Sequence, residues 1–442
     1  MIVEGGVMDE VPRQHRQMYS WAMGVVLERI LLGIREENDE SLDRALRWLI
    51  FLPQALLRSP KEKGKEGRGF VAARFNCLVD RRWGELVRLW ELDRKQFRET
   101  PRNFSQETDE EISDKSRREV MKQLGLGSIS RAVDKITSFG VADISEPEVK
   151  RQMLAKHPPR NKEMQSSVFK DSPVSNLRGF KQDLLNLRSR KGLSPGAGGC
   201  RPEFLVALAE TLQPDKIELL EEFGMYYLRA ELPPWFYKVF LSNLSIALYK
   251  DTTRGPVRPL GVKHQLARSI HRRVVVEKKP EISSFLEPQQ LAMSPAGGNK
   301  LYLGLRMKLE ARQDRQNWAA IKLDVKNAFN SASRGCLIGR LEREPTLRHL
   351  ASLYAVTTAS STDFVSSGEK WGEMDEGFSQ GDPLAGPGFC ITWHEEVVGL
   401  DTTLTYAAEG DEGSARCFCD DLYAEGPVEK LFPAIGKFER DI

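Results

Sequence analysis

The apolar positions in the first part of the chain recur at helical spacing. Two runs within residues 14–57 show this pattern: Trp21, Val25, Ile30 and Ile34, then Leu42, Leu46 and Leu49. Such spacing places apolar side chains on one face of a helix, so two helices are predicted here. Further helices are predicted over 70–97, 120–160, 215–231 and 235–249. The polar run 101–119 is predicted to be a loop, and the basic, Gly-containing run 59–69 a solvated linker.

The last third of the chain has a mixed pattern of strands and helices. "WAAIKLDV" is an apolar run that ends abruptly at an acid, and "TDFVSS" is a shorter run; each predicts a strand. "ARCFCDDLYAEG" predicts a hairpin of two short strands around an acidic tip. Helices are predicted over 300–313, "RGCLIGRLE", "TLRHLASLYAV", "DPLAGPGFCITWHEEVVGL", with its proline in the first turn, and "VEKLFPAIGKFERDI". The fold class expected from these elements is α/β, of the α+β kind.

Composition is that of an ordinary globular protein, with 40% hydrophobic and 29% charged residues. The 65 basic and 63 acidic residues leave a net charge of only +2, which excludes a globally basic nucleic-acid binder. The six cysteines form no CxxC pair, so reduced thiols in an intracellular protein are expected. No uncharged apolar run is long enough to span a bilayer, so we expect a soluble protein that makes no membrane contact.

A local basic patch lies between residues 254 and 279, where the only acid is Glu277. Its basic residues are Arg254, Arg258, Lys263, Arg268, Arg272, Arg273, Lys278 and Lys279. A helix over 264–276 would place Arg268 and Arg272 on one face. A solvated helix face is one interpretation, but the density of charge and the scarcity of acids favour a surface for polyphosphate or nucleic acid. Lys263, Arg268, Arg272 and Arg273 are the candidate contacts.

Three short signals in the last third carry candidate chemistry. Asp324 ends the predicted strand, which in isolation is typical of a turn or cap. Gln380 and Gly381 precede a predicted helix, either as part of a capping sequence or to let a base or sugar approach the backbone. Asp420 and Asp421 are adjacent at the hairpin tip, where two carboxylates repel unless a cation offsets them. Together, the acids suit two-metal phosphoryl transfer, with Asp324 and Asp420 bridging two Mg²⁺ ions.

At these residues the chain resembles the reverse transcriptase family, especially the polymerase of non-LTR (LINE-like) retrotransposons. "LDVKNAFNS" is similar to motif A of the family, "QGDPLAGP" to motif B and "FCDDL" to motif C. "GPVRPLGV" resembles the fingers motif, and "SPGAGGCRPEFLVAL" the Gly-rich entry to the fingers. The resemblance covers about residues 190–442. Phe418 stands where the family usually has Tyr, and Ala385 where many relatives have Ser.

The resemblance implies an RNA-directed DNA polymerase that uses Mg²⁺, two ions, with Mn²⁺ as a substitute. Its implied partners are an RNA template, a primer strand and deoxynucleoside triphosphates. The implied metal-site residues are Asp324, Asp420 and Asp421, with the backbone carbonyl of Val325. The implied nucleotide-binding residues are Arg258 at the triphosphate, Phe329 as the steric gate against a 2′-hydroxyl, and Gln380, Gly381 and Phe418 around the pocket.

The same resemblance implies a right-hand polymerase in three parts. These are a helical N-terminal extension of unknown role over 1–165, fingers over 166–290, and a ferredoxin-like antiparallel palm over 291–442. The sequence stops within what resembles motif D, so a thumb is expected to be absent. Nuclear residence would follow from target-primed insertion, and the oligomeric state is left open.

Two alternatives remain beside the polymerase. A catalytically incomplete retroelement remnant would at most bind RNA through the basic patch. A viral RNA-dependent RNA polymerase would share the palm, but it usually carries Gly-Asp-Asp in motif C. Cys419 and the Gln380-Gly381 pair argue against the viral enzyme.

Overall fold

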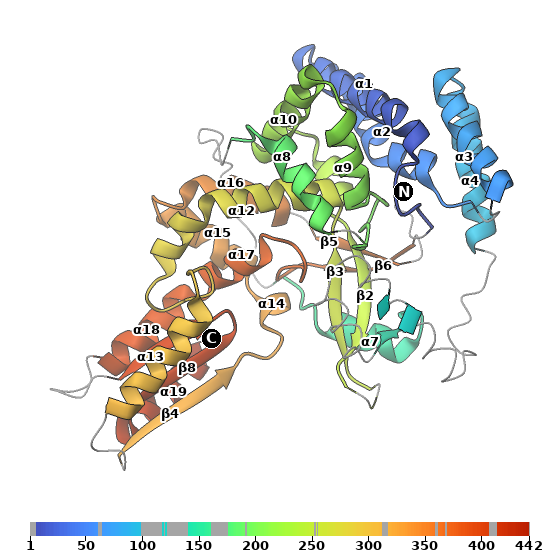
Figure 1. The fold of residues 1–442 in the computed structure, drawn as a ribbon. Helices are drawn as coiled ribbons and strands as arrows, with labels where there is room; N and C mark the ends of the chain where they lie inside the picture. Colours follow the sequence, from blue (N-terminus) through green and yellow to red (C-terminus); the bar gives the residue numbers. More distant parts are fainter. Residues whose placement is uncertain are drawn as a thin grey trace. The chain divides into compact units, whose positions relative to one another are not determined.

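The computed structural model shows a mixed α/β protein with many helices and two small sheets (Figure 1). It describes residues 6–60, 64–98, 117–118, 120–121, 140–160, 176–190, 192–251, 253, 255–311, 317–358, 361–366, 369–405 and 413–441. Two compact units contain them. The first unit is Met1–Ala155, Asn176–Ile270 and Thr362–Glu373; the second is Lys156–Ser175, His271–Ser361 and Met374–Ile442. These units differ from the three expected parts, whose assignment as extension, fingers and palm stays a prediction.

The first unit opens with the two predicted helices, α1 (Arg16–Arg35) and α2 (Asp39–Leu57). Asn38 caps α2 by accepting a hydrogen bond from the backbone N–H of Ser41 at 3.0 Å. Helices α3 (Gly64–Val79) and α4 (Trp83–Arg98) follow. The expected linker over 59–69 is therefore wrong from Gly64 onward, because α3 extends back from the face that buries Val71 and Phe75.

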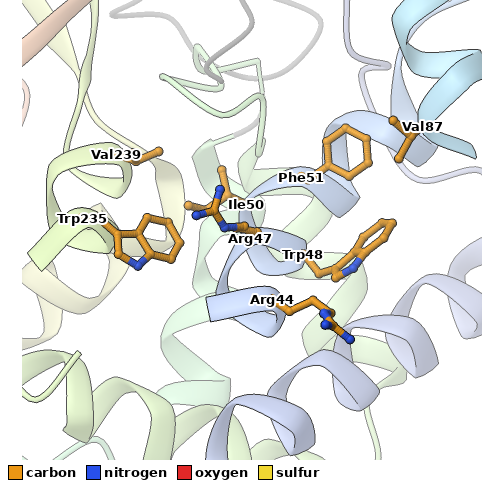
Figure 2. A pocket seen from close by; sticks show the side chains of 8 residues that line it. All are labelled: Arg44, Arg47, Trp48, Ile50, Phe51, Val87, Trp235 and Val239. Carbon is orange, nitrogen blue, oxygen red and sulfur yellow. The ribbon is translucent and has the colours of Figure 1, made fainter. Parts of the chain in front are cut away.

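An apolar pocket of about 280 Å³ lies in this unit between α2, α4 and α11 (Pro234–Phe240) (Figure 2). Its lining residues are Arg44, Arg47, Trp48, Ile50, Phe51, Val87, Trp235 and Val239. Arg47 lies 4.9 Å from the ring centre of Trp235, whose indole N–H donates to Asp43 at 2.5 Å. Arg47 and Arg44 also pair with Asp43 and Glu40 of the same helix. The positive charge at the rim is therefore already offset.

The sheet of the first unit corrects one prediction. Residues 235–249 were expected to be helical, but α11 ends at Phe240 and strand β2 (Asn243–Tyr249) follows. β2 pairs antiparallel with β3 (Val257–Val262), from Leu244 opposite Val262 to Tyr249 opposite Val257. This cross-strand hydrogen bonding outweighs the local helical spacing.

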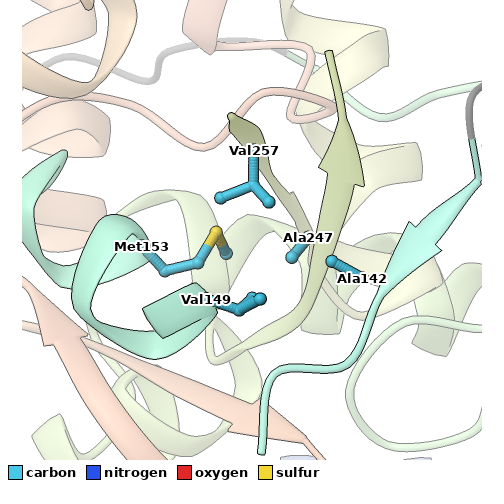
Figure 3. Close-up of a cluster of buried hydrophobic side chains, with 5 residues drawn as sticks. All are labelled: Ala142, Val149, Met153, Ala247 and Val257. Atoms are coloured by element: carbon cyan, nitrogen blue, oxygen red, sulfur yellow. The ribbon is translucent and has the colours of Figure 1, made fainter. Parts of the chain in front are cut away.

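Three further strands complete that sheet: β1 (Val141–Ala142), the predicted β5 (Thr362–Ser366) and β6 (Glu369–Met374). A cluster of buried apolar side chains joins β1, β2 and β3 to α7 (Pro147–Ala155) (Figure 3). Its members are Ala142, Val149, Met153, Ala247 and Val257. The other helices of this unit are α8 (Phe180–Leu185), α9 (Pro202–Thr211) and α10 (Pro214–Leu228).

The second unit contains an antiparallel sheet in the order β4-β8-β7. Its strands are β4 (Trp318–Asp324), β7 (Ser414–Phe418) and β8 (Asp421–Pro427), which confirms the predicted strand and hairpin. Its helices are α13 (Gly297–Ala311), α14 (Ala328–Ser331), α15 (Arg334–Arg343), α16 (Ala351–Thr358), α17 (Ala385–Thr392), α18 (His394–Thr405) and α19 (Val428–Asp441). Helix α12 (Gln265–Leu286) contributes residues to both units.

Alternation along the strands gives this sheet two different faces. Leu422 and Ala424 are fully buried on the face that α18 and α19 cover. Glu425 points from the opposite face, where Lys308 of α13 pairs with it at 3.0 Å. Asp324 and Asp421 share that second face, at the end of the sheet where the strands are most exposed.

The helix predicted to open at Asp382 and Pro383 instead begins at Ala385 and is broken near Trp393 into α17 and α18. The Asp382 carboxylate accepts a hydrogen bond from the Leu384 N–H at 3.0 Å and contacts His271 Nδ1 at 2.9 Å. These contacts hold the preceding residues as a turn.

Of the loop expected over 101–119, the structure describes only 117 and 118. Of the helix expected over 120–160, it describes 120–121 and 140–160. The helix is confirmed there over α7 but is wrong at 141–142, which form β1.

The cysteines and the helices bear on two further predictions, the reduced thiols and the absence of a membrane-spanning segment. All six cysteines are free thiols, as expected. Among the helices that the structure describes, none is long and apolar enough to cross a membrane.

Gly377 supplies a stability prediction. Its φ of +73° favours glycine, and a β carbon at this position would overlap the backbone of Asn330. We expect Gly377→Ala to lower the free energy of unfolding by about 1–3 kcal/mol or more. Gly399→Ala is the matched control, because Gly399 lies in α18 with no atom within 4 Å of an added β carbon. Denaturant unfolding should show the control unchanged or slightly more stable; equal loss in both variants would contradict the prediction.

Candidate functional site

Two acidic side chains meet at the exposed end of the β4-β8-β7 sheet. The antiparallel register sets Asp324, the last residue of β4, directly opposite Asp421, the first residue of β8. Residues paired in this way project from the same face, with β carbons roughly 4.5–5.5 Å apart. On the other side of Asp421, its partner in β7 is Phe418. The fold therefore places Asp324, Asp421 and Phe418 in one row across the sheet.

Asp420 lies beside this row, in the two-residue turn between β7 and β8. Its neighbour Cys419 has a φ of +57°, a conformation that favours glycine. Asp324 and Asp420 were predicted to be the bridging pair. The register instead gives Asp421 the place opposite Asp324, and Asp420 precedes it at the tip.

A lysine partly offsets the negative charge of this row. Lys322, two residues before Asp324 on the same face of β4, pairs with Asp421 through Nζ and Oδ1 at 2.7 Å. Its ammonium also lies 5.6 Å from the ring centre of Tyr423. The hydrogen bond to Asp421 raises the pKa of Lys322. Both side chains of the ion pair are about half exposed, so solvent screens it.

The donors at this site fit a hard divalent cation. Neighbouring carboxylates offer the oxygen ligands that Mg²⁺ prefers, and the carbonyl of Val325 follows Asp324 directly. In the part of the chain that the structure describes, no group of three or more His, Cys, Asp or Glu side chains is gathered closely enough to hold a metal. Asp324 and Asp421, with Asp420 in the turn, therefore lie at one edge of the sheet as oxygen donors without forming such a group in this structure.

Phe329 lies beyond the acids, in the short helix α14. Its ring stacks on Phe389 of α17, with ring centres 4.7 Å apart. The Phe329 carbonyl accepts a hydrogen bond from the Phe378 N–H at 2.7 Å. Gly377 N–H donates to the Ala332 carbonyl at 2.8 Å. The segment after β4 is therefore fastened to the segment before α17, so two of the three sequence signals lie side by side.

Gln380 and Gly381 occupy the turn before α17. Gln380 is half-buried, whereas Gly381 is exposed and has a φ of +111°. The buried Asp382 anchors the turn through its contact with the fully buried His271 of α12. A capping role was one interpretation of Asp382 in the sequence; the structure shows a buried side chain bonded to both His271 and the Leu384 N–H.

The acidic turn also contacts α17. A hydrogen bond between the thiols of Cys390 and Cys419 raises the pKa of Cys390, which is fully buried, and lowers the pKa of Cys419. Cys390 belongs to α17 and Cys419 immediately precedes Asp420. The third sequence signal is thereby joined to the second.

The basic candidates are less concentrated than the sequence suggests. Lys263 is buried, so it does not present the exposed cation that a nucleic-acid surface needs. Arg273 pairs with Glu277 at 3.9 Å, which supplies a counter-charge within α12. Arg272 is exposed and Arg268 is half-buried on the same helix.

Arg258 is exposed on β3, opposite Leu248 of β2. It belongs to the first unit, whereas the acidic row belongs to the second. Its predicted contact with a triphosphate therefore stays a prediction.

A second pocket, of about 290 Å³, opens on the acid-bearing side of the sheet next to α13. Its lining includes Lys300, Lys308, Arg416, Tyr423 and Glu425. Tyr423 is two residues from Asp421 on the same strand face. Cationic and aromatic groups thus continue from the acidic row along the sheet.

The contributors that sequence reasoning missed are Lys322, His271, Cys390 and Gln290, whose side-chain amide bonds to the backbone of Cys419. Each acts through a partner that is remote along the chain. Only Lys322 could have been predicted from the sequence, because it lies two residues before Asp324 and therefore on the same face of the strand.

No family model matches this chain, and no curated protein matches it significantly.

Proposed function

We propose that this chain is the core of an RNA-directed DNA polymerase of the non-LTR retrotransposon kind. The observation that carries the proposal is the β4–β8 register, which sets Asp324 opposite Asp421 with Asp420 in the adjoining turn. Acids clustered at an exposed sheet edge, without enough cations to balance them, favour a divalent-metal site. In this proposal the sheet with α18 and α19 belongs to the palm.

The chain's own residues would divide the work of nucleotidyl transfer. Asp324, Asp421 and Asp420 would hold the metal ions, with the Val325 carbonyl as a further oxygen donor. Two bound Mg²⁺ ions, or Mn²⁺ in their place, supply activation of the primer 3′-hydroxyl and charge stabilisation at the leaving pyrophosphate. The fixed register of β4 and β8 keeps the carboxylates in place before substrate binds, so little reorganisation is needed.

The nucleotide would lie beside the stacked pair Phe329 and Phe389. A ring held under the sugar excludes a 2′-hydroxyl by volume, which favours deoxynucleotides. The exposed Gly381 lets a base or sugar approach the backbone closely, and Gln380 lies next to it. Phe418 extends the row of acids with an aromatic surface, and it is 37% exposed.

The template and primer would be contacted partly through α12, where Arg268 and Arg272 share a helix face. Phosphate contacts of this kind give affinity without sequence selectivity. A retroelement remnant would keep such contacts but lose transfer chemistry. Extension of a primer on an RNA template therefore separates the two interpretations.

The first prediction from this proposal concerns the acids. Primer extension on RNA with deoxynucleotides and Mg²⁺ should fall by about 10³-fold or more in Asp324→Ala and Asp420→Ala, because metal-held charge stabilisation is worth several kcal/mol. Glu429→Ala, which removes an exposed acid from α19, should extend normally. Wild-type rates in either aspartate variant would refute the assignment, and RNA binding without any extension by the wild type would favour the remnant.

The second prediction concerns Lys322, which competes with a metal for Asp421. Removing the ammonium in Lys322→Met should lower the Mg²⁺ concentration for half-maximal extension by about 2- to 5-fold, the range expected for one exposed ion pair. Lys437→Met removes an equal charge from an exposed position on α19 and serves as the control. A higher Mg²⁺ requirement in Lys322→Met would show that the lysine assists the metal rather than opposing it.

The third prediction concerns sugar selection by Phe329. Phe329→Val should raise kcat/KM for ribonucleotides relative to deoxynucleotides by about 10-fold or more, since it removes volume from the sugar pocket. Phe432→Val, which trims an exposed ring on α19, should leave the ratio unchanged. Single-nucleotide incorporation with each sugar gives the ratio, and an unchanged ratio in Phe329→Val would exclude this ring as the gate.

A further inference from the structure

The acidic turn has a second means of support that lies outside the hairpin. Cys419 adopts a φ of +57° between the paired residues Phe418 and Asp421. Its N–H donates to the side-chain oxygen Oε1 of Gln290 at 3.0 Å. Its carbonyl accepts from Nε2 of the same amide, also at 3.0 Å. One side chain therefore binds both polar backbone groups of the residue that precedes Asp420.

The chemistry of this contact requires an amide. Oε1 of Gln290 also accepts from the Ala292 N–H at 3.0 Å, so two N–H groups point at that atom and a carbonyl faces Nε2. This arrangement fixes which end of the amide is the oxygen. Only an acceptor and a donor on one planar group satisfy all three partners.

Gln290 is itself rigidly placed. It is fully buried. Its flanking backbone pairs with β7, since Cys417 N–H donates to the Gln289 carbonyl at 2.7 Å and Leu291 N–H donates to the Cys417 carbonyl at 2.8 Å. Its own N–H donates to the Leu286 carbonyl at the end of α12. Because this backbone is fixed, the Gln290 amide also fixes the position of the turn at Cys419.

We propose that Gln290 is the positioning residue of the acidic turn, holding Asp420 and Asp421 where they bind metal. This inference rests on the proposed polymerase function. A buried group that orients ligands commonly changes metal affinity by about 10- to 100-fold when it is lost. The hydrogen bonds of the Gln290 side chain go to the backbone of Cys419 and Ala292, so it acts on the acids through the backbone of Cys419.

The test compares Gln290→Ala with Gln289→Ala. Gln289 is the adjacent amide, but its side chain donates to Asp401 and does not reach the turn. We expect Gln290→Ala to weaken Mn²⁺ binding, followed by electron paramagnetic resonance, by about 10- to 100-fold. The Mg²⁺ concentration for half-maximal primer extension should rise in step, with KM for deoxynucleotides nearly unchanged. Hydrogen exchange at the Cys419 amide should accelerate, and Gln289→Ala should match the wild type in all three measurements.

Gln290→Glu separates positioning from a general loss of packing. The protonated carboxyl has the amide's shape and can donate to the Cys419 carbonyl, whereas the ionised form cannot. Burial favours the protonated form. The Mn²⁺ affinity of each variant is divided by that of the wild type at the same pH. For Gln290→Glu this ratio should rise toward one as the pH falls, whereas for Gln290→Ala it should stay low.

The outcomes distinguish this inference from the function on which it rests. If the wild type extends primers and both Gln290 variants bind Mn²⁺ as tightly as it does, the positioning role is wrong and the polymerase proposal stands. A pH-independent Mn²⁺ affinity in Gln290→Glu that equals the affinity of Gln290→Ala would also reject the role. If the wild type neither binds Mn²⁺ nor extends primers, the polymerase proposal fails and this inference fails with it.

Discussion

The candidate site depends on the pairing of β4 with β8. Side chains on a strand alternate between faces, so a slip of one residue would turn Asp324 toward α18 and α19 and a leucine toward solvent. Apolar pairing prevents such a slip: the half-buried Leu323 and Ile321 lie opposite the fully buried Leu422 and Ala424. Apolar burial on one face therefore fixes the place of the carboxylates on the other. This constraint involves no catalytic atom, yet it sets which acids can share a cation.

Placing like charges side by side costs free energy, and the fold limits that cost in two ways. The acids stand at the exposed end of the sheet, where water screens them, and Asp421 is about half exposed. Lys322 adds a positive charge from the same face. An arrangement that buried the acids would raise the free energy of the folded state, because the charged carboxylates would lose their hydration. The exposure that lowers the electrostatic cost is the same exposure that a nucleotide would need for access.

How far the sequence predicts this structure depends on the range of the interactions. The β7–β8 hairpin and β4 could be predicted because their apolar runs and the acidic tip are local signals. The strand β2 was predicted as a helix, since its pairing with β3 is not visible in its own spacing. The fold brings Asp324 next to the Asp420–Asp421 pair, but Asp421 rather than the expected Asp420 stands opposite Asp324. Register depends on which leucines are buried together, which one strand alone does not reveal.

The contacts that sequence reasoning missed are those that fix the positions of the turns beside the acids. Gln290, His271 and Cys390 are buried side chains, each bonded to a segment distant along the chain. They hold the turns on either side of the acids: His271 through Asp382, and the other two through Cys419. A turn with a positive φ at a non-glycine residue is strained and persists only when its surroundings impose it. The tip of the β7–β8 hairpin therefore owes its shape to an amide and a thiol outside the hairpin, and its acids would lose their fixed direction if the hairpin alone were kept.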